Sequence, residues 1–140
     1  MRIVMIGTGY VGLVSGVCLA DFGHEVICVD NDNAKIEMLN SGEVPIFEPN
    51  LKSLINKNVN ASRLKFTTDL KESMNNANVV FIAVGTPSRR GDGHADLSYV
   101  YAATNEISKH INKFTVIATK STVPVGTGDE IEKILSKNHS

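Results

Sequence analysis

Short apolar runs alternate along the chain with segments whose apolar residues recur at helical spacing. Strands are predicted at residues 3–6, 25–29, 64–67, 79–84 and 115–119. The run 79–84 is apolar at every position, as expected of a strand that is covered on both faces. This alternation is typical of βαβ units, so the chain is predicted to form a doubly wound α/β domain with a mostly parallel sheet.

Helices are predicted between these strands. Their expected ranges are 10–22, 32–40, 51–57, a short helix from 69, 98–111 and 127–136. Capping signals precede several of them: Asn31 or Asp32, Asp69 with Glu72, Asp96 or Ser98, and Thr127 with Glu130. The segments 41–50 and 85–95 are rich in Gly, Pro or charge and are predicted to be irregular.

Length and composition narrow the class of protein. A chain of 140 residues suits one domain, so residues 1–140 are predicted to form a single unit. Its 14 basic and 15 acidic residues give a net charge of −1, which argues against a nucleic-acid partner. No apolar run reaches the roughly 18–20 residues of a membrane span. The chain shows no secretory signal, and its two cysteines, Cys18 and Cys28, fit reduced thiols. A cytoplasmic protein is therefore expected.

A glycine-rich turn follows the first predicted strand. Gly7, Gly9 and Gly12 match the pattern G-x-G-x-x-G and open the first helix, with Tyr10 and Val11 between them. In that context Gly7 permits a tight turn, Gly9 admits a pyrophosphate and Gly12 lets the helix pack closely. The unpaired amides at the helix start favour an anion. We therefore predict a Rossmann fold that binds a dinucleotide.

The second strand ends on an acidic residue. Asp30 lies 18 residues after Gly12, close to the position where dinucleotide-binding domains bond the adenosine ribose. A carboxylate there repels a 2′-phosphate, which favours NAD over NADP. Lys35, one turn into the next helix, is in reach of the ribose or a phosphate, although its spacing alone favours a solvated helix lysine.

Two further segments are expected at the same edge of the sheet. Ligands of open α/β sheets bind at the carboxyl ends of strands, where the strand order reverses. Gly85, Thr86 and Pro87 follow the fourth predicted strand, and Ser121 and Thr122 follow the fifth. Both segments are predicted to line the cofactor cleft. No metal site is expected, because the four histidines show no ligand spacing.

The chain resembles the UDP-glucose/GDP-mannose dehydrogenase family over essentially its whole length. The similar segments, in order, are Gly7–Val14, Ile46–Leu51, Val84–Pro87, Asp92–Val100 and Lys120–Thr127. The segment 46–51 departs from the family, which usually has tyrosine and glycine where Phe47 and Asn50 stand. The form of residues 7–14 favours the members that act on UDP-glucose.

The resemblance implies an NAD-dependent, four-electron oxidation of UDP-glucose to UDP-glucuronate. It places Val11, Asp30 and Lys35 at the adenosine half of NAD and Thr86 at its phosphate and ribose region. Thr122 would lie near the nicotinamide, where it helps to position a catalytic water, and Glu48 would shape the cleft.

The family's thiol nucleophile, catalytic lysine and catalytic asparagine match no residue of this chain. Cys18 and Cys28 are interpreted as small buried hydrophobes. The resemblance therefore implies that residues 1–140 are the cofactor-binding part of a longer, homodimeric enzyme. Alone, this part is expected to be a monomer that binds NAD without turnover. The alternatives are a GDP-mannose or UDP-N-acetyl-mannosamine dehydrogenase domain, or a non-enzymatic NAD-sensing module.

Overall fold

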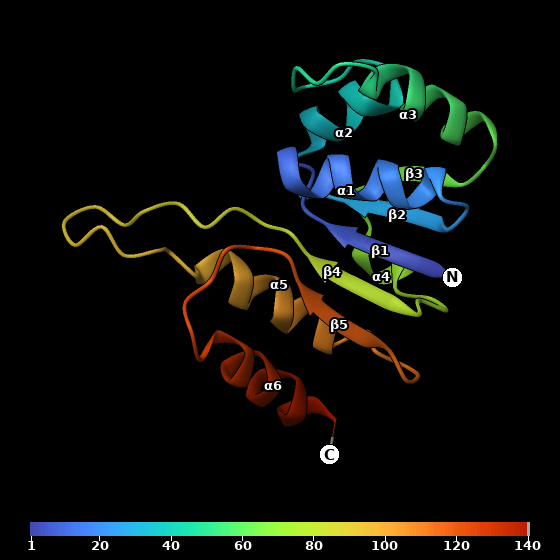
Figure 1. The fold of residues 1–140 in the computed structure, drawn as a ribbon. Coiled ribbons are helices and arrows are strands. Elements are labelled where there is room, and N and C mark those ends of the chain that lie inside the picture. The colour runs from blue at the N-terminus through green and yellow to red at the C-terminus, as the bar shows by residue number, and fades with distance from the viewer. Residues whose placement is uncertain (140) are drawn as a thin grey trace.

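Five parallel strands form a single sheet in the computed structural model, which describes residues 1–139 (Figure 1). The strands are β1 (Arg2–Ile6), β2 (Glu25–Val29), β3 (Leu64–Thr67), β4 (Val79–Ile82) and β5 (Val116–Thr119). Their order in the sheet is β3-β2-β1-β4-β5, and every neighbouring pair is parallel. The order reverses between β1 and β4, which confirms the predicted doubly wound topology.

Helices cover both faces of the sheet. One face carries α1 (Tyr10–Asp21), α2 (Asn33–Asn40) and α3 (Leu51–Asn60), and the other carries α4 (Leu70–Ser73), α5 (Ser98–Ser108) and α6 (Thr127–Asn138). Side chains of β1 alternate between the two layers, as in any strand. Ile3 and Met5 pack in the core beneath α1, whereas Val4 and Ile6 pack in the core that includes α5 residues.

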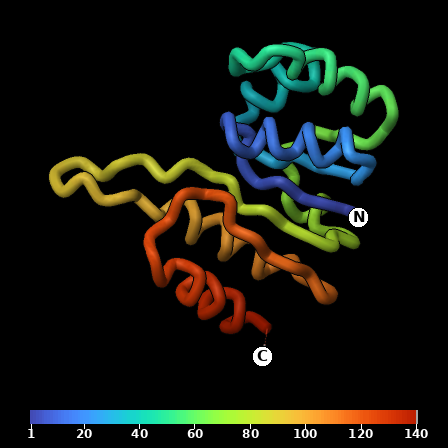
Figure 2. Tube along the Cα trace, viewed as in Figure 1, coloured from blue at the N-terminus to red at the C-terminus, as the bar shows by residue number. Residues whose placement is uncertain are grey.

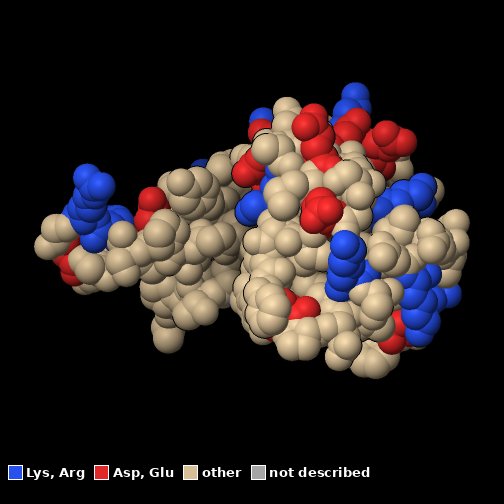
Figure 3. All heavy atoms as spheres, turned by 90° about the horizontal axis from the view of Figure 1, so that it is seen from above, with Lys and Arg blue, Asp and Glu red and all other residues tan. Residues whose placement is uncertain are grey.

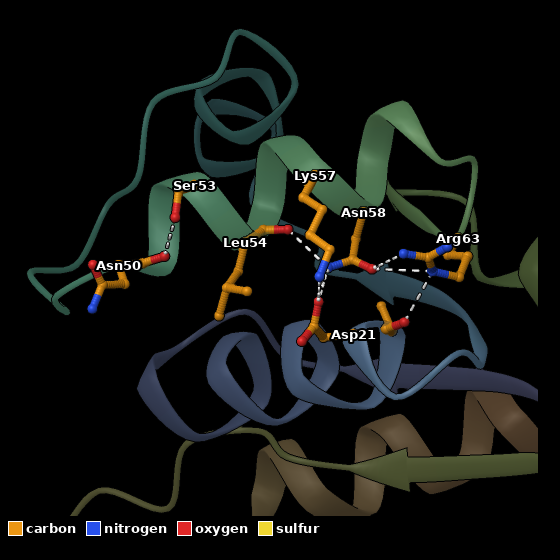
Figure 4. Close-up of polar contacts among 8 residues, drawn as sticks. Asp21, Asn50, Ser53, Leu54, Lys57, Asn58 and Arg63 are labelled. Carbon is orange, nitrogen blue, oxygen red and sulfur yellow. Dashed lines mark hydrogen bonds and ion pairs between the residues drawn. The ribbon is translucent and has the colours of Figure 1, made fainter.

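A polar network joins the end of α1 to α3 (Figure 4). Asn58, which is wholly buried, donates from Nδ2 to Asp21 Oδ1 at 3.2 Å. The guanidinium of Arg63 donates to Asn58 Oδ1 at 3.0–3.1 Å and to the carbonyl of Ala20 at 3.2 Å. Lys57 pairs with Asp21 at 3.0 Å on the surface. The network satisfies the buried amide and fixes α3 against α1, the helix that opens at the glycine turn.

Several element boundaries differ from the sequence prediction. β4 ends at Ile82, two residues short of the apolar run, because the Ala83 carbonyl lies against the Gly7 turn. α3 and α6 run further than predicted, to Asn60 and Asn138, and α5 ends earlier, at Ser108. Residue 140 lies outside the described residues.

The predicted caps have mixed outcomes. Asp32 and Asp69 cap α2 and α4, accepting from the amides of Lys35 and Glu72. The capping box at Thr127 is wrong, because α6 begins at that residue after Gly126 and the Thr127 hydroxyl donates to the Pro124 carbonyl. α5 begins after Leu97, so neither Asp96 nor Ser98 occupies the capping position, although Asp96 accepts from the Ser98 amide.

Residues 85–96 form a long hairpin that projects from the body between β4 and α5 (Figures 1 and 2). Its two limbs are joined at Ser88 and Ala95 and by the Arg89 amide, which donates to the His94 carbonyl at 2.6 Å. Arg89 also pairs with Asp92 at 2.7 Å. On the face seen in Figure 3, basic and acidic side chains are interspersed over the body and the hairpin. Within residues 1–139, no helix is long and apolar enough to cross a bilayer.

Candidate functional site: a cleft at the strand crossover

A cleft of about 1020 Å³ lies at the carboxyl ends of the strands, where the order of the sheet reverses. The β1–α1 turn, the end of β2 and the segments after β4 and β5 line it together. The predicted binding residues in its wall are Gly7, Gly9, Tyr10, Val11, Asp30, Lys35, Gly85, Thr86, Pro87, Ser121 and Thr122. Gly12 is the predicted residue that does not line it, because Gly12 is buried behind the turn.

The glycine turn has the geometry that its sequence predicts. Gly7 has a φ of +105°, and a Cβ there would lie 2.5 Å from the Ala83 carbonyl oxygen. A Cβ on Gly12 would overlap the Gly7 carbonyl oxygen and touch the Ala83 methyl. Both positions therefore exclude other residues. A Cβ on Gly9 would instead meet open space on the cleft side, which is the room that a pyrophosphate needs.

The start of α1 faces this space. Gly9 occupies the capping position, and no side chain of the described residues caps the helix there. The first amides of α1 are therefore available to a ligand, and the positive end of the helix dipole points the same way. A phosphate group suits this place, because it can meet the first amides of α1, the positive end of the helix dipole and the space left by the missing side chain of Gly9.

Asp30 is held at the end of β2 by three hydrogen bonds. Its Oδ2 accepts from the Thr8 amide at 2.9 Å and from the Thr8 hydroxyl at 2.6 Å, and its Oδ1 accepts from the Asp32 amide at 3.0 Å. Partial burial by itself would raise the pKa of Asp30, but these bonds and the charge of Lys35 outweigh burial and lower it. The carboxylate is therefore ionised and fixed in the cleft.

The segments after β4 and β5 are tied together beside the turn. Ser121 donates from its hydroxyl to the Val84 carbonyl at 2.8 Å, and the amides of Lys120 and Ser121 both donate to the Ile82 carbonyl. The Ser121 proton is thus committed to the backbone. Thr86 is half-buried and Thr122 is exposed in the cleft wall, so both present polar groups to the cleft.

A tyrosine and a glutamate meet at the mouth of the cleft. The Tyr10 hydroxyl donates to Glu48 Oε2 at 2.7 Å, which fastens the irregular segment 41–50 beside the start of α1. The hydrogen bond to Glu48 and its negative charge raise the pKa of Tyr10. Glu48 thus supports the residue that lines the cleft. Sequence reasoning assigned Glu48 a loose shaping role and did not pair it with Tyr10.

Sequence reasoning missed part of the cleft. Its wall continues over Thr68 and Leu70 after β3 and over Ala102, Ala103 and Glu106 of α5. No motif marks these residues. They come from the segment after β3, from α4 and from α5, which the fold brings to the same cleft.

The two cysteines lie outside this cleft. Cys28 is wholly buried, and burial raises the pKa of its thiol to about 12, which disfavours the nucleophilic thiolate. Cys18 is partly exposed, so the prediction that it is a buried residue was wrong. The buried side of α1 is formed by Gly12, Leu13, Gly16, Val17 and Ala20.

Comparison with known proteins points to one family. The model of the UDP-glucose/GDP-mannose dehydrogenase family, NAD binding domain, matches residues 1–140. The UDP-glucose 6-dehydrogenase of Rhizobium meliloti is 64% identical over 99% of this chain, which covers 32% of that protein. The UDP-glucose 6-dehydrogenase TuaD of Bacillus subtilis is 49% identical over 97% of the chain and 29% of that protein.

Solved structures agree with these sequence matches. A ternary complex of GDP-mannose dehydrogenase from Pseudomonas aeruginosa superposes with a TM-score of 0.93 at 37% identity, covering 99% of this chain and 32% of that one. A UDP-glucose dehydrogenase from Pyrobaculum islandicum gives a TM-score of 0.91 at 33% identity, over 97% and 32% of the two chains. The chain thus spans about a third of the length of the relatives that it matches.

Proposed function

The chain belongs to the UDP-glucose/GDP-mannose dehydrogenase family, whose NAD-binding domain it matches throughout, and we propose that it is the cofactor-binding part of an enzyme that oxidises UDP-glucose. In this proposal residues 1–140 form the NAD domain, and the thiol nucleophile, the dimer interface and most of the sugar-nucleotide site belong to the rest of a longer enzyme. The cytoplasm is the proposed compartment.

The observation that carries the proposal is the fixed carboxylate of Asp30 beside an open glycine turn. The residues fit NAD, because the space beyond Gly9 admits the pyrophosphate, the amides of α1 face it, and Asp30 offers a negatively charged acceptor where an adenosine ribose would lie. Lys35 stands beside that carboxylate. Tyr10, Val11, Gly85, Thr86, Pro87 and Ser121 complete the proposed wall around the cofactor.

NAD supplies the hydride acceptor for each of the two oxidation steps. Thr122 lies in the cleft wall after β5 and is exposed, so its hydroxyl is free to hold a water beside the reacting carbon. This role makes Thr122 the proposed catalytic residue of the domain. It positions the water, and the covalent chemistry belongs to groups outside residues 1–140.

UDP-glucose is the favoured substrate. The chain is 64% identical to a UDP-glucose 6-dehydrogenase and 37% identical to a GDP-mannose dehydrogenase, although both share its fold. Membership of a family of dehydrogenases also favours an enzyme domain over an NAD-sensing module.

The enzymatic part of the proposal is tested in a protein that carries this domain at the full length of its relatives. With UDP-glucose and NAD, NADH formation should be measurable, at two NADH for each UDP-glucuronate. Thr122→Val should lower kcat about 100-fold, since small losses of positioning have effects of this size. Thr122→Ser should retain most of the activity. An unchanged kcat in Thr122→Val, or oxidation of GDP-mannose in preference to UDP-glucose, would contradict the proposal.

A further inference from the structure

Thr8 has no role in the glycine pattern, yet it is the most deeply buried polar residue of the turn. It stands between Gly7 and Gly9, where the G-x-G-x-x-G pattern accepts any residue. Its exposed fraction is 0%. A hydroxyl in such a place is costly to bury unless it makes a hydrogen bond, so its partner indicates its purpose.

That partner is the carboxylate of Asp30. The Thr8 hydroxyl donates to Oδ2 at 2.6 Å, within the short range of hydrogen bonds to ionised oxygens, and the Thr8 amide donates to the same oxygen at 2.9 Å. The two bonds approach Oδ2 from one residue and fix the rotation of the carboxylate. The Asp32 amide holds the other oxygen, Oδ1, at 3.0 Å.

The hydrogen bonds leave one acceptor position open. An ionised carboxylate has about four lone-pair positions, two on each oxygen. Thr8 uses both positions on Oδ2, and Asp32 uses one on Oδ1. The remaining position is on Oδ1 of a residue that lines the cleft beside Lys35.

We propose that Thr8 is a positioning residue for cofactor selection, whose hydroxyl holds Asp30 so that Oδ1 accepts a hydrogen bond from an adenosine ribose hydroxyl. The inference rests on the proposed function, because it assumes that the cleft binds a dinucleotide. It assigns the selection of NAD over NADP to two residues acting together. Asp30 carries the charge that repels a 2′-phosphate, and Thr8 prevents that charge from turning away.

The physical basis is preorganisation. A side chain that is already fixed in its bound orientation loses little conformational freedom when the ligand arrives. Without the Thr8 hydroxyl, Oδ2 keeps the amide alone, and the carboxylate gains freedom to rotate. NAD should then bind more weakly, whereas NADP should be rejected less strongly.

Two substitutions separate the hydroxyl from the volume of the side chain. Thr8→Val keeps the shape and removes the hydroxyl, and Thr8→Ser keeps the hydroxyl and removes a methyl group. Calorimetric titration of residues 1–140 with NAD and with NADP gives both affinities for each variant, and urea unfolding gives its stability. We expect Thr8→Val to bind NAD about tenfold more weakly, with a smaller ratio of NAD to NADP affinity, because the Asp30 carboxylate must then be ordered when NAD binds.

NAD affinity and folding stability should respond differently in the two variants. Thr8→Ser should retain the NAD affinity and the selectivity even if its unfolding midpoint falls, a combination that a purely structural role for Thr8 does not produce. Equal NAD affinity and selectivity in wild type and Thr8→Val would overturn the inference and leave the proposed function standing. Absence of NAD binding by the folded wild-type chain would overturn both. Should Thr8→Val fail to fold, Thr8→Ala replaces it in the same comparison.

Discussion

Asp30 is a carboxylate of the cleft wall that hydrogen bonds hold in place. It is half-buried, it accepts hydrogen bonds from Thr8 and Asp32, and Lys35 lies close enough for its charge to act. Burial opposes ionisation of Asp30, while the hydrogen bonds and the lysine favour it, and the latter prevail. The folded chain therefore favours the ionised form of Asp30 over its protonated form more strongly than the unfolded chain does.

This shift predicts a pH dependence of stability. Because the folded pKa of Asp30 is lowered, its contribution is fully present above the unfolded pKa of about 3.9 and is lost as the pH falls through the folded pKa. The free energy of unfolding of the wild type should therefore decrease from about pH 5 to about pH 2, and Asp30→Asn should show a shallower decrease. Urea unfolding at several pH values measures both slopes. Asp129→Asn, at an exposed position of α6, controls for loss of a charge, and equal slopes for wild type and Asp30→Asn would contradict the argument.

Residue patterns predicted which residues form the site better than they predicted the hydrogen bonds between those residues. Gly7, Gly9 and Asp30 were identified because backbone sterics and charge leave few alternatives at their positions. The Thr8–Asp30 and Tyr10–Glu48 pairs were not identified, since each joins residues more than twenty positions apart that no spacing rule connects. At Asn50, by contrast, the structure explains a departure from the family that was visible in the sequence. Its φ of +65° explains why glycine is usual at this place in the family and why asparagine is tolerated.

At the level of elements, a polar network fixes α3 against the C-terminal end of α1, the end opposite to the glycine turn. Asn58 is the buried centre of this contact and Arg63 reaches it from the end of α3, whereas Lys57 contributes a surface ion pair (Figure 4). Buried hydrogen-bonded groups and exposed ion pairs differ several-fold in what their loss costs.

Asn58→Ala should therefore destabilise the chain by about 2–3 kcal/mol, because it removes the buried amide that accepts from the Arg63 guanidinium and donates to Asp21. Lys57→Ala, which removes the neighbouring surface pair, should cost less than about 0.5 kcal/mol. Urea unfolding of the two variants measures the difference. Similar costs for both would show that the network adds nothing beyond surface electrostatics.

Hydrophobic periodicity and capping signals predicted the existence and order of the eleven elements within residues 1–139 but not all of their ends. Periodicity reports which positions are apolar, and the apolar run continues past the end of β4 at Ile82, through Ala83, which is buried, and Val84, which is partly buried. The cap at Thr127 failed for a related reason. The spacing of Thr127 and Glu130 fits a capping box, yet Gly126, with its left-handed backbone, occupies the capping position, so the helix starts one residue earlier than a Thr127 cap would start it.

The whole molecule is a sheet with a helical layer on each face and a hairpin that extends beyond it (Figure 2). The cleft lies at the carboxyl ends of the strands. A second hollow, of about 720 Å³, lies where the hairpin meets α5 and the segment before α6, with Arg89, His94, Tyr101 and Pro124 in its wall. Local sequence patterns could not predict this hollow, because the tertiary fold brings its lining residues together from separate segments of the chain. The cleft itself was predictable, because its position depends only on strand order.

We propose that this cleft selects NAD through the glycine turn and Asp30. The most direct measurement is calorimetric titration of residues 1–140 with NAD and then with NADP, beside two valine variants. Gly9→Val fills the open space at the turn, and Gly128→Val places the same side chain at an equally open position on α6. We expect wild type and Gly128→Val to bind NAD, with NADP at least about tenfold weaker, and folded Gly9→Val to bind neither. Equal affinity for NAD and NADP, or undiminished binding by Gly9→Val, would contradict the proposal.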